Sequence, residues 1–353
     1  MNIMFKSTRG DKNYVTASQA IVQGIANDGG LFVPETIPTI DFPLEKITEM
    51  SYQELAYEVL KLILTDYTEE ELKYCINSAY DEKFYTKLIA PLVSAGNGNF
   101  LELFHGKTIA FKDMALSILP YLLKTAAKKN GVEEKIVILT ATSGDTGKAA
   151  LEGFADVEGT KIIVFYPEDG VSDVQKMQMV TQKGANTCVA AIKGNFDDAQ
   201  SAVKRIFTDN ELKAELKKNG YVFSSANSIN IGRLAPQIVY YFYAYAQLAR
   251  IEKNKDVVFC VPSGNFGNIT AGLFAKRMGL PVKRFIAANN RNDIFLQYLI
   301  TGKYEPRPSI PTIANAMDVG NPSNFARILD LYENSHEAIC KEISGVSYTD
   351  DQI

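Results

Sequence analysis

The sequence contains no tryptophan, only two histidines and only four cysteines among its 353 residues. These cysteines, Cys75, Cys188, Cys260 and Cys340, are scattered and form no C-x-x-C pair. Neither a disulfide framework nor a zinc cluster is supported by so few dispersed ligands, so we expect no metal site. A reducing, cytoplasmic location fits this cysteine usage best.

The chain also lacks a strong excess of either charge and any long apolar run. Its formal net charge is −4, and no basic stretch stands out above its acidic neighbours. This balance argues against a nucleic-acid partner. No run approaches the roughly 18 apolar residues of a membrane span, and the N-terminal stretch MNIMFKSTRGDKNY has no apolar core of a signal peptide. We expect no membrane partner.

From about residue 135 onward, short β-rich runs alternate with helical patterns. The expected strands are 135–140, 161–167, 187–192, 221–226, 256–262 and 282–288. The expected helices are 146–157, 173–184, 197–217, 231–252 and 268–279. This rhythm predicts an α/β fold with largely parallel sheets that carry helices on both faces.

The first hundred residues differ from this pattern. Residues 52–64 and 68–84 are acidic, amphipathic helical segments, and residues 88–100 look like a connector. We place a domain boundary near residue 95, which gives domains 1–95 and 96–353. Residues 335–353 end on a polar turn, with no terminal element that closes the fold.

The first notable turn, within TATSGDTGKAA, follows an expected strand and opens an expected helix. Its polar and small residues are Thr142, Ser143, Gly144, Asp145, Thr146 and Gly147. Hydroxyls and free N–H groups at a helix N-terminus can bind a carboxylate or phosphate. A Walker loop is excluded, because Thr142 and Ala149 occupy positions that require glycine and serine or threonine. A simple capped helix start is the alternative.

A second turn, within VFCVPSGNFGNITAG, also joins an expected strand to an expected helix. It contains Ser263, Gly264, Asn265, Phe266, Gly267 and Asn268. Its glycines let the backbone approach a ligand, and its N–H groups can hold a phosphate. The spacing is not the G-x-G-x-x-G of dinucleotide-binding proteins. A tight turn between strand and helix is the alternative.

A third stretch, SSANSINIGRLAPQIVYYFYAYAQL, precedes and enters an apolar helix. Arg233 is able to bind a phosphate or carboxylate with two hydrogen bonds, and Ser228 lies nearby in the sequence. The alternative is that Asn and Ser residues cap the helix while Arg233 is solvated. For the tyrosines of this helix we favour a place in the core.

Lys112 lies in HGKTIAFKDMAL, between a β-branched, aromatic run and a helix-forming one. If residues 111–124 are helical, Lys112 shares an apolar stripe with leucines and faces inward, whereas Asp113 faces outward with Ser117. Pro120 would weaken or kink this helix. An inward lysine either extends to the rim of the sheet or has a lowered pKa and a function.

A buried lysine, a glycine-rich phosphate loop and an anion-binding turn together indicate a pyridoxal phosphate enzyme. The amine would react with the cofactor aldehyde, the loop would hold its phosphate, and the turn would bind an amino-acid carboxylate. Each motif is weak alone, and the combination is specific.

The sequence resembles the threonine synthase family of fold-type II pyridoxal phosphate enzymes over essentially the whole chain. The shared motifs are STRG (7–10), GIANDGGLFVPE (24–35), ELFHGKTIAFKD (102–113), TSGDTG, GNFDDAQ (194–200), PSGNFGN and MDVGNPSNFAR (317–327). The resemblance implies a fold like the tryptophan synthase β subunit, with two parallel-sheet α/β lobes, the smaller at about 125–220, and a mainly helical N-terminal domain.

The resemblance also implies roles for individual residues. Lys112 would be the catalytic, Schiff-base lysine. The cofactor-binding residues would be Lys112, Asp145, Ser263, Gly264, Asn265, Phe266, Gly267 and Asn268. The substrate-binding residues would be Thr142, Ser143, Gly144 and Thr146 for the carboxylate, with Ser228 and Arg233 for the substrate phosphate. GNFDDAQ is expected to be structural, since Asp197 and Asp198 suit a helix N-terminus and lack further metal ligands.

The implied activity is a carbon–oxygen lyase reaction of threonine biosynthesis. O-phospho-L-homoserine would lose phosphate by γ-elimination, water would add at Cβ, and Lys112 would shuttle the protons. Lys107 stands where the family has proline, and would either add a cation beside the substrate phosphate or loosen a turn. Family members usually continue further, so we expect an incomplete C-terminus, weakened cofactor binding and little activity.

Two other functions compete with this interpretation. Another lyase of the same fold, such as threonine dehydratase, would use a similar lysine and phosphate loop. A catalytically silent, threonine synthase-like binding protein would keep the fold without the reaction. The sequence leaves both a monomer and a homodimer open.

Overall fold

The computed structural model describes residues 2–251 and 256–353. Its N-terminal part pairs β1 (Phe5–Ser7) with β2 (Phe32–Pro34) in antiparallel fashion. The helices of this part are α1 (Ala17–Gln23), α2 (Leu44–Ile47), α3 (Tyr52–Ile63) and α4 (Glu69–Ala79). Ser51 and Thr68 begin α3 and α4 with capping boxes, in which the N-cap hydroxyl and the N3 glutamate bond each other's backbone N–H. The two predicted amphipathic helices are confirmed.

Residues 88–100, which we expected to be a connector, contain most of a β-hairpin. β3 (Leu92–Ala95) pairs in antiparallel fashion with β4 (Gly98–Leu101). Gly96 opens the two-residue turn with φ 57°, a conformation that favours glycine and suits tight hairpins. The boundary predicted near residue 95 falls inside this hairpin, and the division into domains stays a prediction.

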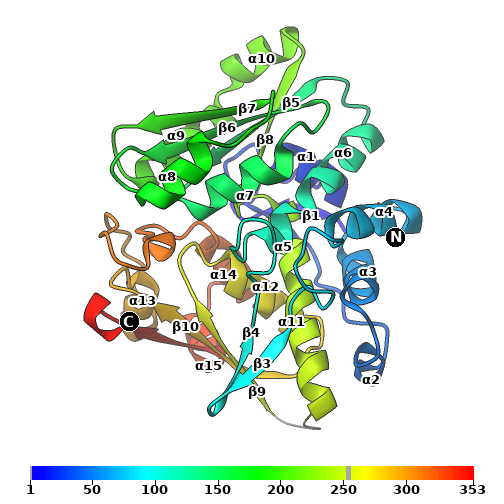
Figure 1. Ribbon diagram of the computed structural model, residues 1–353, viewed down its shortest axis with the longest axis vertical. Coiled ribbons are helices and arrows are strands. Elements are labelled where there is room, and N and C mark those ends of the chain that lie inside the picture. The colour runs from blue at the N-terminus through cyan, green and yellow to red at the C-terminus, as the bar shows by residue number, and fades with distance from the viewer. Residues whose placement is uncertain (1, 252–255) are drawn as a thin grey trace.

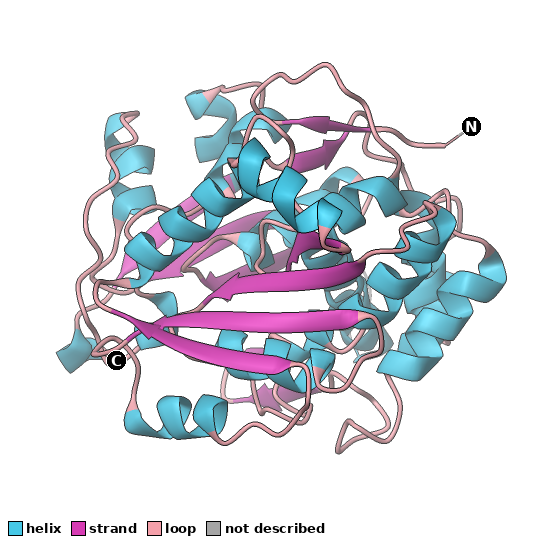
Figure 2. Ribbon diagram, turned by 90° about the horizontal axis from the view of Figure 1, so that it is seen from above, coloured by secondary structure: helices cyan, strands magenta, loops and turns pink. Residues whose placement is uncertain are grey.

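The smaller lobe, at the top of Figure 1, contains a parallel sheet in the order β7-β6-β5-β8. The strands are β5 (Lys135–Ala141), β6 (Thr160–Pro167), β7 (Thr187–Ile192) and β8 (Tyr221–Ser225). The helices are α7 (Asp145–Phe154), α8 (Asp173–Val180), α9 (Phe196–Thr208) and α10 (Asn210–Lys218). Helices lie on both sides of the strands in Figure 2, which explains why six of the seven β5 residues are buried.

The helix predicted over 197–217 is two helices in the structure. Asp209 ends α9 in an extended conformation, and its side chain accepts a hydrogen bond from the Leu212 backbone N–H at the start of α10. Aspartate favours such N-cap positions because its carboxylate satisfies an N–H that the helix leaves unpaired. The apolar periodicity continues across this break and conceals it.

The larger lobe, below it in Figure 1, contains a parallel sheet in the order β11-β10-β9. The strands are β9 (Val257–Pro262), β10 (Val282–Asn289) and β11 (Ile343–Ser347). The helices are α11 (Ile231–Ile251), α12 (Gly267–Arg277), α13 (Ile294–Thr301), η1 (Asn315–Met317), α14 (Phe325–Leu331), α15 (His336–Glu342) and η2 (Asp350–Gln352). The expectation that residues 335–353 add no closing element is wrong, because β11 pairs with β10 along five residues.

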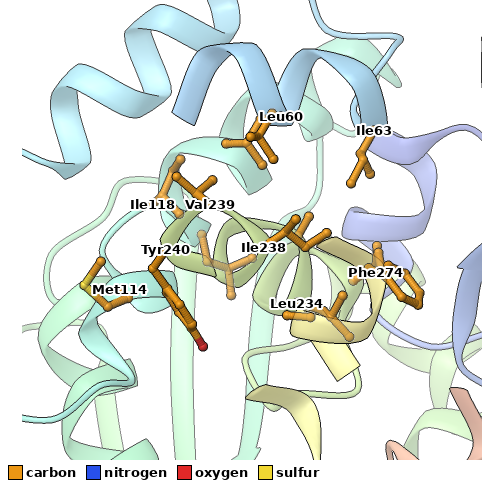
Figure 3. Packing of buried hydrophobic residues seen from close by; sticks show 14 of the residues in the cluster. Leu60, Ile63, Met114, Ile118, Leu234, Ile238, Val239, Tyr240 and Phe274 are labelled. Atoms are coloured by element: carbon orange, nitrogen blue, oxygen red, sulfur yellow. The ribbon is translucent and has the colours of Figure 1, made fainter. Parts of the chain in front are cut away.

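The helix α11 is the centre of the main hydrophobic core, and sixteen of its residues are buried. Figure 3 shows Val239 of α11 beside Ile118, with Leu60 of α3 close by. Tyr240, Tyr241 and Tyr243 are at most 3% exposed, which confirms the predicted core role of these tyrosines. A helix that is apolar all round must be buried on every side, and α3, α5 (Asp113–Leu116) and α12 supply its neighbours.

The segment around Lys112 is not one helix over 111–124. It forms α5 (Asp113–Leu116) and then α6 (Leu119–Lys129). Pro120 lies in the first turn of α6, where its missing N–H costs no helical hydrogen bond. Lys112 itself is the N-cap residue of α5.

Candidate active site

A cavity lies where β5 and β9 end, and residues of both lobes form its wall. Among the predicted site residues, its lining includes Lys112, Ser143, Thr146, Ser228, Arg233 and the whole loop 263–268. Thr142, Gly144 and Asp145 are not in its lining. The carboxyl ends of parallel strands thus bring together motifs that are up to about 150 residues apart in the sequence.

Lys112 is 8% exposed, and its amine faces Asp145. Its Nζ lies 3.2 Å from Asp145 Oδ2 and 4.8 Å from the centre of the Phe111 ring. Burial lowers the pKa of Lys112, while the negative charge of Asp145 opposes this change. Burial also acts to raise the pKa of Asp145, but the Lys112 charge and a hydrogen bond from Gln175 outweigh it and the pKa is lowered.

Asp113 is buried, so the prediction that it faces outward is wrong. Its two carboxylate oxygens accept the Thr108 backbone N–H at 2.8 Å and the Thr108 hydroxyl at 2.6 Å. A Cβ on Gly106 would lie 2.5 Å from the Asp113 Cβ, so the chain passes close to this carboxylate. These contacts join Gly106 and Thr108, which precede Lys112, to Asp113, which follows it. The backbone around Lys112 is therefore fixed by the tight loop 106–113 and not by a continuous helix.

The turn 142–147 uses one of its hydroxyls internally. Thr142 Oγ1 accepts the backbone N–H groups of Gly144 at 2.9 Å and Gly147 at 2.8 Å. Gly144 has φ 134°, a conformation that side chains rarely adopt. Ser143 and Thr146 are left at the cavity wall, where their hydroxyl groups can meet a ligand.

Loop 263–268 comprises the turn that joins β9 to α12 and the first two residues of α12, and its conformation is suited to an anion. Phe266 caps α12 with a left-handed φ of 61°. Within the described residues, the backbone N–H groups of Gly264, Asn265 and Phe266 have no backbone or side-chain acceptor. Three adjacent free donors at the start of an eleven-residue helix are a typical site for phosphate.

Ser228 and Arg233 reach the cavity from the loop before α11 and from its first turn. Ser228 Oγ accepts amide hydrogens from Asn265 at 2.8 Å and Asn324 at 3.0 Å. Arg233 is 3% exposed, which excludes the solvated alternative, and burial lowers its pKa to about 10. Its Nη1 donates to the Ala226 carbonyl, and its Nε has no partner among the described residues.

Several residues of the site were not among the predicted site residues. Gln237, Met317 and Val319 line the cavity, and Arg327 supports it from behind with hydrogen bonds to the carbonyls of Ser228 and Ile229. Met317, Val319 and Arg327 lie within the motif 317–327 that we matched to a family, so that motif was the available signal. No periodicity marks Gln237 as a site residue, since its place at the cavity depends on contacts between distant segments.

Lys107 does not line the cavity. Its Nζ lies 3.4 Å from Glu152 of α7, and its side chain is half exposed. The expected structural role of GNFDDAQ agrees with the helix start that it forms, where Asn195 and Asp198 complete a capping box. Within the described residues, no three His, Cys, Asp or Glu side chains gather as metal ligands.

Two family models and many individual proteins match this chain. A model described as threonine synthase N terminus matches residues 4–80, and one described as pyridoxal-phosphate dependent enzyme matches residues 100–353. A threonine synthase of Pseudomonas aeruginosa is 40% identical, over 98% of this chain and 74% of that protein. The chain belongs to the threonine synthase family.

Solved structures of this family agree with the fold. Threonine synthases of Escherichia coli and Brucella melitensis, the second described as bound to pyridoxal phosphate, are each 36% identical to this chain with a TM-score of 0.87. They cover 99% of this chain, which covers 78% and 79% of theirs. The predicted fold-type II architecture and membership of the threonine synthase family are confirmed. Among the described helices, none is long and apolar enough to cross a membrane.

The cofactor of threonine synthases is pyridoxal phosphate, and the cavity suits it. The buried Lys112 amine lies at one part of the wall, and the free N–H groups of loop 263–268 lie at another. A Cβ on Gly264 would lie 2.9 Å from the Met317 Cα, so only glycine at this position allows the loop to pack this closely against Met317. An amine, an anion-binding loop and a tightly packed wall are the features that this cofactor requires.

Proposed function

We propose that this chain converts O-phospho-L-homoserine and water to L-threonine and phosphate. The observation that carries the proposal is the position of the buried Lys112 amine in the same cavity as loop 263–268 and the turn 142–147. In this arrangement a lysine, a loop that would bind the cofactor phosphate and a turn that would bind the substrate carboxylate line one cavity.

Pyridoxal phosphate, when bound, supplies a ring that accepts the electron pair left by proton removal. Loop 263–268 would hold its phosphate with backbone N–H groups. Ser143 and Thr146 would hold the carboxylate of the substrate, because their side chains lie at the helix N-terminus of α7. These contacts would place the substrate Cα beside Lys112.

Lys112 would move the protons at the substrate Cα and Cβ. A lysine can remove a proton only as a neutral amine, and burial favours that form here. Asp145 Oδ2 lies 3.2 Å from Lys112 Nζ, so the Asp145 carboxylate would stabilise the positive charge of the amine whenever the amine is protonated. The pair can thus alternate between the two protonation states that proton shuttling needs.

Arg233 and Ser228 would bind the phosphate that leaves the substrate. Arg233 is buried at the cavity wall with Nε unpaired among the described residues, so an anion there would satisfy a group that the protein leaves without an acceptor. Ser228 is held in place by the amides of Asn265 and Asn324. This assignment places the substrate phosphate close to loop 263–268.

The test compares two products. Purified protein loaded with pyridoxal phosphate is given O-phospho-L-homoserine, and threonine and phosphate are measured; separately it is given L-threonine, and 2-oxobutanoate is measured. We expect threonine and phosphate in equal amounts, with Lys112→Ala reducing turnover by about 10³-fold or more. Lys124→Ala, a change at a surface lysine of α6, should retain turnover.

Each rival function predicts a different result. Formation of 2-oxobutanoate from threonine as the main reaction would assign the chain to the dehydratases. Cofactor binding without either product would support a silent binding protein. If Lys112→Ala kept full turnover, the catalytic assignment of this lysine would be wrong.

A further inference from the structure

The carboxylate that faces Lys112 is held by a chain of amides that reaches from one lobe to the other. Gln175 of α8 donates from Nε2 to Asp145 Oδ1 at 2.8 Å, while Lys112 approaches Asp145 Oδ2. Asn315 of η1 donates from Nδ2 to Gln175 Oε1 at 2.9 Å. None of these amides was indicated by the sequence motifs, and Gln175 and Asn315 do not line the cavity.

We propose that Gln175 is a positioning residue that aims Asp145 at Lys112, and that Asn315 holds Gln175 in this orientation from the larger lobe. The proposal concerns how the proton-transfer pair is set, and it rests on the proposed function for its biological meaning. Its geometry, however, depends only on the four residues Lys112, Asp145, Gln175 and Asn315.

The partners of Gln175 leave its side-chain amide one orientation. Its Oε1 accepts the Ser172 backbone N–H at 3.1 Å and the Asn315 amide at 2.9 Å, so the oxygen points away from Asp145. Its Nε2 then points at the carboxylate. If the amide were reversed, Gln175 Oε1 would face Asp145 Oδ1, and the hydrogen bonds that Ser172 and Asn315 donate to Oε1 would be lost.

Close packing holds Gln175 over the turn that carries Asp145. A Cβ on Gly144 would lie 2.4 Å from Gln175 Cδ, so the glutamine occupies the space beside the turn that a side chain would otherwise fill. Asp145 is the first residue of α7, where a freed carboxylate has other donors available at the helix start. Among the described residues, Lys112 is the one other side chain that donates a hydrogen bond to this carboxylate.

The short helix η1, which carries Asn315, also contacts loop 263–268. Met317, two residues later in η1, packs against Gly264, whose added Cβ would lie 2.9 Å from the Met317 Cα. η1 therefore contacts loop 263–268 through Met317 and contacts Gln175, which supports Asp145, through Asn315. A ligand that shifts loop 263–268 would shift the partner of Gln175 as well.

The experiment measures the ionisation of Lys112 directly, in protein without cofactor or substrate. Lys112 is labelled with a limiting amine reagent at a series of pH values, and its peptide is quantified by mass spectrometry to give a midpoint pH. We expect Gln175→Leu to lower this midpoint, because a misdirected Asp145 stabilises the ammonium less. A midpoint change of one pH unit corresponds to about tenfold more labelling at a pH below both midpoints. Asn315→Leu should act in the same direction with a smaller effect.

Two controls separate this effect from damage to α8 or from wider access of the reagent. Ser172→Ala removes the hydroxyl that caps α8 and that donates to Gln175 Oε1 at 3.2 Å, but it keeps the Ser172 backbone N–H and Asn315 as donors to that oxygen, so it should stay close to the wild-type midpoint. Asp145→Asn lowers the midpoint by itself, and adding Gln175→Leu to it should lower the midpoint no further. Circular dichroism checks that each variant is folded.

An unchanged midpoint in folded Gln175→Leu would overturn the proposal, as would an equal shift in Ser172→Ala. An additive shift in the Asp145→Asn background would also overturn it, because Gln175 would then act by another route. Since no cofactor or product is involved, failure to form threonine would refute the proposed function and leave this result standing. Threonine formation together with an unchanged labelling midpoint in Gln175→Leu would refute only the role of Gln175.

Discussion

Lys204 of α9 is a largely buried lysine near the supports of the cavity. Its Nζ donates to Ser323 Oγ at 2.8 Å, and Ser323 in turn donates its backbone N–H to Asn265 Oδ1 in loop 263–268. Burial is the main reason that the pKa of Lys204 falls to about 8, and the like charge of Arg9 adds to it. In an unfolded chain the lysine regains its ordinary pKa of 10.5, so folding costs free energy whenever this lysine is protonated in both states.

The sign of the pH dependence follows from this difference. Between about pH 8 and pH 10.5 the unfolded chain binds more protons at Lys204, so its contribution to stability rises with pH. We expect Lys204→Met to be stabilised relative to the wild type at neutral pH, with the advantage shrinking by up to about 3 kcal/mol by pH 10.5. Urea unfolding of both proteins across this pH range measures the difference.

The same substitution at the exposed Lys217 controls for the loss of a surface lysine. It should change the unfolding free energy by less than about 0.5 kcal/mol and show no comparable trend with pH. A constant difference between Lys204→Met and the wild type at all pH values would contradict the argument from burial.

At the scale of residues, the sequence predicted identities better than directions. Lys112 is buried as its helical spacing indicated, yet Asp113 is buried too, because α5 lasts only one turn and the loop before it closes on the carboxylate. The sequence left open whether Arg233 binds a ligand or is solvated, and only its burial within the first turn of α11 excluded the solvated alternative. Gln175 has no sequence signal, since Asp145 and Asn315, the partners that define its role, come from two distant segments.

At the scale of elements, Arg327 of α14 joins three parts of the chain by its guanidinium. It donates to the carbonyls of Phe32 in β2 and of Ser228 and Ile229 before α11, and to the side chain of Asn324. Lysine in its place has the charge but not the planar fork that reaches these acceptors together. We expect Arg327→Lys to lower the unfolding free energy by about 2–4 kcal/mol, measured by chemical denaturation.

Arg284→Lys is the matched control for this change. Arg284 is exposed and donates to the carbonyls of Cys340 and Lys341, so its replacement should cost less than about 1 kcal/mol. Equal destabilisation by the two substitutions would show that burial of Arg327 between α14, β2 and α11 is not what makes it important.

The predicted elements were most accurate where a single hydrophobic periodicity dominates the sequence. The strands of the smaller lobe are short apolar runs bounded by turns, and each was found within a few residues. Errors arose where the periodicity continued across a boundary, as at Asp209, or where a strand needed a partner far along the chain. β11 is such a case, because its pairing with β10 bridges more than fifty residues.

At the scale of the whole molecule, the alternation of strands and helices was enough to predict parallel sheets with helices on both faces. It was not enough to say how the two lobes meet, since that depends on contacts such as the pair of Gln175 and Asn315. The site lies where these contacts gather, so a ligand there links the lobes. A ligand that binds only the folded state must raise the stability of both lobes.

A comparison of two aldehydes tests this link between ligand and fold. Pyridoxal phosphate at about a hundred times its dissociation constant should stabilise the folded protein by about 2.7 kcal/mol, a rise of about 4 °C in Tm for a chain of this length. Pyridoxal carries the same aldehyde and ring but lacks the phosphate that loop 263–268 would bind. At the same concentration it should therefore raise Tm by much less, and Lys112→Ala should reduce the gain from both compounds. If pyridoxal stabilised the protein as strongly as pyridoxal phosphate, the free N–H groups of loop 263–268 would not be the phosphate site.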